Sequence, residues 1–168
     1  ESRRDKAMLE LIYASGMRVT ELVSLDMEDV NLEDGFVRCF GKGSKERVIP
    51  IHDQAVQDLR TYLAQARPLL AGEDERALFV NQRGKRLTRQ GFWLILKNYA
   101  RRLGIEDQIT PHMLRHSVAT HLLHSGKMNL RELQEFLGHA SISTTQIYTH
   151  LTDEHVRRVY EASHPRAR

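Results

Sequence analysis

The sequence offers little from which to build disulfides or a membrane anchor. Its single cysteine, Cys39, excludes an internal disulfide and suits a reducing compartment, where a lone thiol in an apolar strand packs as a small hydrophobe. No stretch approaches the roughly 20 apolar residues of a transmembrane helix, and the charged first residues do not form a secretory signal. We therefore expect a cytoplasmic protein of a bacterium or archaeon, with no membrane partner.

Acidic residues spaced to hold Mg²⁺, which a two-metal nuclease would need, are also missing. Histidine is the one metal-ligand type that gathers, because four of the nine fall in one predicted helix, at 112, 116, 121 and 124. On that helix the first two histidines would lie on a different flank from the last two. The chain also has neither a His-Glu-x-x-His motif nor a cysteine pair. We predict no metal and no cofactor, and we interpret His116, His121 and His124 as helix-face or core residues.

Positive charge is present in slight excess and is unevenly placed. The formal net charge is +3 for 168 residues, a length that fits one domain with its own core. Basic residues gather in four clusters: Lys42, Lys45 and Arg47; Arg83, Lys85, Arg86 and Arg89; Arg101 and Arg102; Arg157, Arg158, Arg166 and Arg168. Each cluster alone is typical of a solvated face, but four of them beside a phosphate site would form a footprint for double-stranded DNA.

The first half of the chain alternates between helical and strand patterns. Two strands with a period of two are joined by a glycine-rich hairpin tip that holds Lys42. The expected elements of this half are helices over 2–16 and 19–25, strands Phe36–Phe40, Glu46–Ile51 and Ala77–Val80, a helix that ends near Pro68, and a helix from Thr88 to Gly104.

The second half reads as helices throughout. Thr110-Pro111 is a strong start signal, because threonine accepts hydrogen bonds from unpaired amides and proline at the first helical position loses none. Asn129 and Glu132 have the spacing of a capping box. The expected elements are helices over 110–125 and 129–137, the second closing at Gly138, a helix from Ser143 through Thr149, and a last helix from Asp153 to before Pro165. Because no internal repeat or domain boundary is visible, we expect one α+β domain that is mainly α.

His112 and Arg115 are the first pair that points to chemistry. Three residues apart on a helix, they lie about 60° apart around the axis and project from the same face. An imidazole handles protons, and a guanidinium presents paired donors to phosphate oxygens near a helix start. The pair describes an oxyanion site, although a His-x-x-Arg spacing alone is more often structural, as is an arginine such as Arg18 at a helix start.

Five segments, taken in order, resemble the tyrosine recombinase (phage-integrase-like) family, in particular its Xer branch. They are Ala14–Leu22 (ASGMRVTEL), Gly41–Arg47 (GKGSKER), Thr110–His116 (TPHMLRH), Leu137–His139 (LGH) and Thr144–His150 (TTQIYTH). The likeness covers nearly the whole chain. It implies the family's catalytic fold, a helical bundle with a small three-stranded antiparallel sheet, and an enzyme that cleaves and rejoins DNA at specific sites. It also implies six catalytic residues: Arg18, Lys42, His112, Arg115, His139 and Tyr148.

The chemistry of each side chain suggests its part in the implied reaction. A tyrosine with a pKa near 10 is only about 0.1% ionised at neutral pH, so Tyr148 needs a base, for which His112 is the best candidate. Arg18 and Arg115 would clamp the non-bridging phosphate oxygens. Lys42 would protonate the departing 5′ oxygen. His139 would donate a hydrogen bond to the same phosphate, and His150 has no assigned role.

The implied product is a 3′-phosphotyrosine with a free 5′ hydroxyl, which rejoins without ATP or metal. Two alternatives remain: a catalytically silent DNA-binding accessory module, and a strand breaker like the type IB topoisomerases. Six occupied positions argue against the first, and the Xer-like segments and short length against the second. Tyr148 alone would be interpreted as a core aromatic; its setting favours a nucleophile.

The resemblance also implies partners that this chain does not contain. The chain begins within the first catalytic helix, so we expect that the family's amino-terminal DNA-clamping domain is absent and that 1–168 is a catalytic domain that binds DNA weakly. Residues 154–168 resemble a terminal helix that docks into a neighbouring protomer, either self or a paralogous recombinase, although folding back onto its own domain is an equal alternative. Chromosome-dimer resolution and a DNA translocase activator are further expectations. The target sequence is beyond reach.

Overall fold

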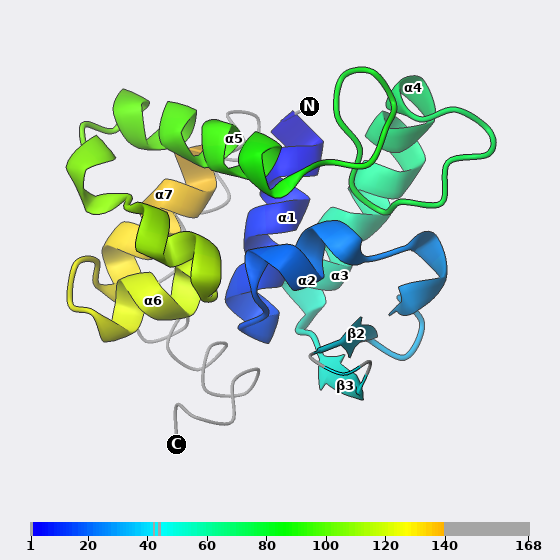
Figure 1. Cartoon of the computed structure of the whole chain (residues 1–168), viewed down its shortest axis with the longest axis horizontal. Coiled ribbons are helices and arrows are strands. Elements are labelled where there is room, and N and C mark those ends of the chain that lie inside the picture. Colours follow the sequence, from blue (N-terminus) through cyan, green and yellow to red (C-terminus); the bar gives the residue numbers. More distant parts are fainter. Residues whose placement is uncertain (1, 42, 44, 140–168) are drawn as a thin grey trace.

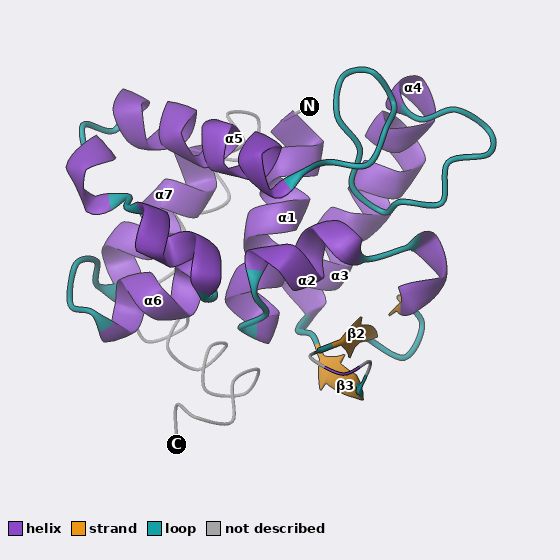
Figure 2. Cartoon of the chain, viewed as in Figure 1, coloured by secondary structure: helices purple, strands orange, loops and turns teal. Residues whose placement is uncertain are grey.

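The computed structural model describes residues 2–41, 43 and 45–139, which form a helical bundle beside a small sheet (Figures 1 and 2). Its α-helices are α1 Ser2–Ser15, α2 Val19–Ser24, α3 Asp53–Thr61, α4 Arg67–Leu70, α5 Arg89–Arg102, α6 Val118–His124 and α7 Leu130–His139. The other helical segments are the 3₁₀ turns η1 Met27–Asp29, η4 Glu106–Gln108 and η5 Pro111–Arg115 and the π-helical η3 Tyr62–Ala66. The strands are β1 Val30–Asn31, β2 Phe36–Phe40 and β3 Glu46–Pro50. The predicted fold, mainly helical with a three-stranded antiparallel sheet, is confirmed.

Helix α1 is the centre of the bundle (Figure 1). Twelve of its fourteen residues are buried, because it packs against α2, α3 and η3 on one side and α6 and α7 on another. Apolar residues such as Met8, Leu11 and Ile12 are at most 1% exposed, and such burial is the main favourable contribution to folding. The buried helix α1 therefore fixes the position of the turn that follows its last residue.

The sheet stands at the edge of the bundle, below α3 in Figure 1. Its order is β1-β2-β3, all antiparallel, with Val37 opposite Val30 on one side and opposite Ile49 on the other. In β2, Val37 and Cys39 face the core while their neighbours are more exposed, as the period of two requires. Burial raises the pKa of the Cys39 thiol to about 12, so this cysteine is a packing residue, as its context predicted.

Two sequence expectations about strands and helix ends are wrong. Ala77–Val80 is not the third strand: it forms only isolated bridges, to Asp26 and to Arg86, and runs buried along the bundle. The third strand is β1, whose two residues were too few to show a period. Helix α7 continues through Gly138, because a glycine inside a helix weakens it without ending it.

A third expectation, one helix over 110–125, is also wrong. The segment begins at Pro111 as predicted, but η5 is a 3₁₀ turn, and His116 and Ser117 are extended before α6 starts. The Thr110 side chain makes no capping bond; Ser117 caps instead, accepting from the Thr120 amide at 3.5 Å. Within residues 2–41, 43 and 45–139, none of the helices is both long and apolar enough to cross a bilayer.

Candidate active site

Arg18 is positioned by a tight turn between α1 and α2. Gly16 has φ of 68°, which lets its amide donate to Ile12 O at 2.9 Å and ends α1. Met17 is fully buried and anchors the turn. Arg18 itself is extended, at the N-cap of α2, with its side chain exposed. The turn thus fixes the backbone of Arg18 and directs its guanidinium outward.

Glu21 joins this turn to the sheet. Its carboxylate accepts from the backbone amide of Arg18 at 3.0 Å and from Arg47 of β3 at 3.0 and 3.1 Å. Glu21 is 11% exposed and Arg47 is 54% exposed, so the pair lies at the rim of the protein. A single carboxylate therefore sets the distance between Arg18 and the strand that follows the Lys42 hairpin. The sequence reasoning missed Glu21; its place three residues after a predicted N-cap was the available signal.

The break between η5 and α6 shapes the other side of the site. Met113 is fully buried and holds η5 against the bundle, while His112, Arg115 and His116 are exposed. Because the chain turns at Ser117, α6 runs back past η5, and the rings of His112 and His121 come within 5.3 Å of each other. On a continuous helix, nine residues would separate them by roughly 13 Å along the axis.

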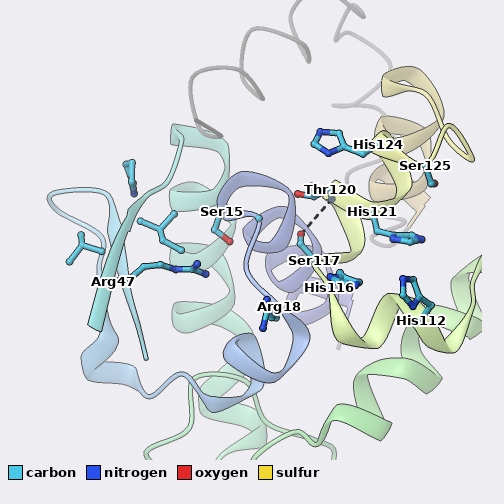
Figure 3. Close-up of a pocket in the computed structure, with 14 residues that line it drawn as sticks. Ser15, Arg18, Arg47, His112, His116, Ser117, Thr120, His121, His124 and Ser125 are labelled. Atoms are coloured by element: carbon cyan, nitrogen blue, oxygen red, sulfur yellow. Dashed lines mark hydrogen bonds between the residues drawn. The ribbon is translucent and has the colours of Figure 1, made fainter. Parts of the chain in front are cut away.

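These elements enclose a pocket of about 670 Å³ (Figure 3). Its lining comes from the α1–α2 turn, from β3, and from the consecutive η5 and α6, which are three separate parts of the sequence. The lining residues are Ser15, Gly16, Arg18, Arg47, Val48, Ile49, Pro50, His112, His116, Ser117, Thr120, His121, His124 and Ser125. No carboxylate is among these described residues. Beside the apolar Val48, Ile49 and Pro50, the described lining presents cations, imidazoles and hydroxyls, a set of polar groups that suits an anion.

The histidines of the lining form a cluster. The ring of His116 lies 4.9 Å from that of His112 and 6.2 Å from that of His121, centroid to centroid. Partial burial, followed by the positive charge that His112 and Lys127 carry when protonated, lowers the pKa of His121. Among the described residues, no three histidine, cysteine or acidic side chains are placed to hold a metal ion. The sequence reasoning missed this cluster because it assumed one unbroken helix.

The six predicted catalytic residues are described to different extents. Arg18 and His112 line the same pocket (Figure 3). Arg115 lies in η5 beside His112, exposed, but it is not among the described residues that line the pocket. His139 is the last residue of α7, and its side chain lies outside the described part of the chain, as do Lys42 and Tyr148.

Several of the basic residues that suggested a DNA footprint have structural partners. Arg86 binds Asp26 and donates to the carbonyls of Val23 and Leu25, which ties the 80–86 turn to α2. Arg101 pairs with Glu106. Some members of these basic clusters therefore have a structural role within the protein. The fourth cluster, which comprises Arg157, Arg158, Arg166 and Arg168, lies outside the described residues.

The sequence of this chain is similar to known proteins along nearly its whole length. Residues 1–155 match the model of the phage integrase family. The chain is 57% identical to the tyrosine recombinase XerD of Oceanobacillus iheyensis, over 99% of this chain and 56% of that protein. It is 58% identical to the tyrosine recombinase XerC of Herpetosiphon aurantiacus, over 97% of this chain and 53% of that protein. The chain thus spans little more than half the length of these relatives.

Two solved structures share the fold. The crystal structure of XerA recombinase has a TM-score of 0.59 at 34% identity and covers 97% of this chain and 57% of its own. The XerH site-specific recombinase, in a post-cleavage complex with its palindromic difH substrate, has a TM-score of 0.57 at 32% identity and covers 95% of this chain and 44% of its own. The bundle and sheet described above are therefore those of recombinase catalytic domains.

Proposed function

This chain belongs to the phage integrase family, and on that premise we propose that it is the catalytic part of a site-specific tyrosine recombinase. The protein cleaves a DNA strand by attack of Tyr148 on a backbone phosphate, holds a 3′-phosphotyrosine, and religates the strand to a partner. Its proposed cellular role is chromosome-dimer resolution in the cytoplasm, and the identities to XerD and XerC support this proposal.

One observation carries the proposal: Arg18 and His112, 94 positions apart, line one pocket whose described wall has no carboxylate. A guanidinium that stays charged and an imidazole that exchanges protons near neutrality are what a phosphodiester needs from its surroundings. Glu21 is not among the described lining residues; its carboxylate contacts the Arg18 backbone and Arg47.

Each residue has a definite part in the proposed reaction. Arg18 and Arg115 hold the non-bridging oxygens and stabilise the charge of the transition state. His112 takes the proton from Tyr148 as the phenolic oxygen bonds to phosphorus. Lys42 gives a proton to the 5′ oxygen as the P–O bond breaks, and His139 donates a hydrogen bond to the phosphate.

The reaction balances without an energy source. One phosphodiester is exchanged for a phosphotyrosine ester of similar energy, and the 5′ hydroxyl of the partner strand reverses the step. During religation His112 returns the proton to the tyrosine, and Lys42 accepts one from the attacking hydroxyl. The proposed partners are the DNA site, a second recombinase protomer and an activating translocase. The second protomer is of the same or a paralogous kind and docks through residues 154–168.

A trapping assay tests the function. A duplex with a nick near the cleavage point loses a short 5′ fragment when it is cut, which prevents religation and leaves the protein joined to DNA. We expect a species that stays joined after denaturation with the wild-type chain and none with Tyr148→Phe. A covalent species that survives Tyr148→Phe would refute the assignment, and binding without any covalent species would favour the silent accessory module.

A further inference from the structure

The pocket extends well beyond Arg18 and His112. Its lining continues along α6 through Ser117, Thr120 and His121 to His124 and Ser125 (Figure 3). One phosphate held between Arg18 and His112 would occupy only one end of it. The remaining part is walled by imidazoles and hydroxyls, and the proposed reaction assigns them no role.

The imidazoles in this part are close enough to limit one another's charge. The ring of His116 lies 6.2 Å from that of His121, and His112 lies 4.9 Å from the first and 5.3 Å from the second. Like charges at such separations repel, and for His121 this repulsion adds to burial in lowering the pKa. An anion placed between them would reverse the balance, because it turns repulsion among imidazolium groups into attraction by a shared counter-charge.

We propose that His116 and His121, with His124 beside them, hold a second DNA backbone phosphate next to the one that is cleaved, and that they take up protons when it binds. The inference rests on the proposed function for the identity of the ligand. This histidine site would make phosphate binding depend on pH. Contacts from arginine and lysine alone would not change with pH in the neutral range.

The charged groups around the cluster are mainly cationic, which favours an anionic ligand. Arg18 faces it from the α1–α2 turn and Arg47 from β3, while Lys127 follows α6. His112 and Arg115 share η5 with the neighbouring His116. The described contacts of these groups include one carboxylate, that of Glu21, and Arg47 already donates hydrogen bonds to it. Burial, followed by the positive charge of His112, Lys127 and His116, lowers the pKa of His121, so the groups around this ring are cationic.

Binding as a function of pH tests the proposal. The chain with Tyr148→Phe, which cannot cleave, is titrated into a fluorescent 30-base-pair duplex of random sequence, since phosphate contacts do not depend on sequence. At constant ionic strength we expect the dissociation constant to fall by about tenfold from pH 8 to pH 6. The slope of log affinity against log salt becomes steeper at pH 6, by about 0.9 for each histidine contact.

Three variants separate this contact from general charge effects. His116→Gln combined with His121→Gln weakens binding at pH 6 and flattens the pH dependence. His116→Lys keeps a charge at pH 8, so it tightens binding there and also flattens the profile. Lys97→Gln, a control, removes a partly buried cation that pairs with Glu106 outside the pocket lining and leaves the pH dependence as in the wild type.

The outcomes distinguish this inference from the function on which it rests. If the double histidine variant keeps the pH profile of the wild type, the second phosphate site is refuted, even when the Tyr148 protein cleaves the nicked duplex normally. If the chain neither binds duplex at any pH nor forms the covalent species, the proposed function is refuted instead. Thermal unfolding of each variant checks the fold; His116 is exposed, so its replacements should leave the melting temperature unchanged.

Discussion

At the scale of single residues, Arg18 combines a fixed backbone with an exposed side chain. The buried Met17 before it and the Glu21 carboxylate bonded to its amide hold the backbone, while the guanidinium faces the pocket. A residue held in this way loses little freedom when it binds phosphate. Its planar pair of donors, rather than its charge alone, should then matter for the reaction.

Arg18→Lys tests this distinction. Lysine keeps the charge but cannot bind two phosphate oxygens at once, so we expect covalent-complex formation to slow by about 10²- to 10³-fold while duplex affinity changes little. Single-turnover trapping on the nicked duplex measures the first, and fluorescence anisotropy the second. Arg101→Lys, which alters an arginine paired with Glu106, is the control. Equal loss of binding and cleavage would mean that Arg18 serves only to hold DNA.

Glu21 acts through other groups, because it contacts the Arg18 backbone and Arg47 but does not line the pocket among the described residues. Glu21→Gln keeps an oxygen to accept from the Arg18 amide and removes the charge that holds Arg47. Since Arg47 is half exposed, we expect the free energy of unfolding to change by less than about 1 kcal/mol.

The cleavage rate of Glu21→Gln should fall more than its stability, because β3 leads directly from the Lys42 hairpin and is no longer tied to the α1–α2 turn. Urea unfolding and the trapping assay give the two numbers. The comparison variant is Arg47→Gln, which breaks the same pair from the other side and should show the same loss. A rate equal to that of the wild type in both variants would remove the pair from the mechanism.

At the scale of elements, the site is built from turns and short segments. The α1–α2 turn, the five-residue strand β3, the 3₁₀ turn η5 and the seven-residue helix α6 contribute the lining residues, and the longer helices α5 and α7 contribute none among the described residues. Turns of this kind depend on particular backbone conformations. Gly16, in the α1–α2 turn, has φ of 68°; Gly104, which is not among the described lining residues, has a similar φ of 72°.

Gly16→Ala should destabilise the protein by about 1 kcal/mol, because a side chain disfavours the left-handed region. It should also slow cleavage, since the turn sets the direction of Arg18. Gly16→Asn should recover much of both, because asparagine tolerates this conformation better. Gly104→Ala is the control: a Cβ there meets nothing within 4 Å, so it should cost similar stability without affecting cleavage. Unfolding in urea and the trapping assay measure the effects.

At the scale of the whole molecule, the central helix carries charged residues into the core. Glu10 of α1 is 2% exposed, beside the buried ion pair of Lys6 with Asp58 and 3.7 Å from the Nε2 of His52. Burial, followed by the negative charge of Asp58, raises the pKa of Glu10 to about 8. Burial raises the pKa values of Asp5 and Asp58 as well. The folded protein therefore retains protons that the unfolded chain releases.

This difference predicts how stability varies with pH. Because the folded-state pKa of Glu10 exceeds the unfolded one, its contribution is complete below about pH 4.5 and is lost as the pH rises to about 8. At about 1.4 kcal/mol per pKa unit, the loss is of the order of a few kcal/mol. Glu10→Gln cannot ionise, so its free energy of unfolding should fall less between pH 5 and pH 8.

Urea unfolding of both proteins at pH 5, 6, 7 and 8 makes the comparison. Glu106→Gln is a suitable control, because that carboxyl is exposed and the neighbouring Arg101 lowers its pKa, so it cannot produce a loss of stability in this range. Parallel curves for the wild type and Glu10→Gln would show that Glu10 is already ionised in the folded protein.

The sequence by itself determined the features that depend on neighbours in the chain. The Thr88 cap, the Asn129–Glu132 capping box, the glycine after α1 and the hairpin strands β2 and β3 are confirmed, because each follows from local conformational preference. The family followed from five ordered segments. The catalytic assignments stay predictions for all six residues: Arg18, Lys42, His112, Arg115, His139 and Tyr148.

The tertiary structure decided what depends on packing between distant segments. Burial of Met113 and the cap at Ser117 break the expected long helix, and only that break brings His121 back to His112. The Glu21–Arg47 pair likewise joins residues 26 positions apart. No local sequence pattern predicts such contacts, because the groups that make them come together only when the bundle has formed around α1.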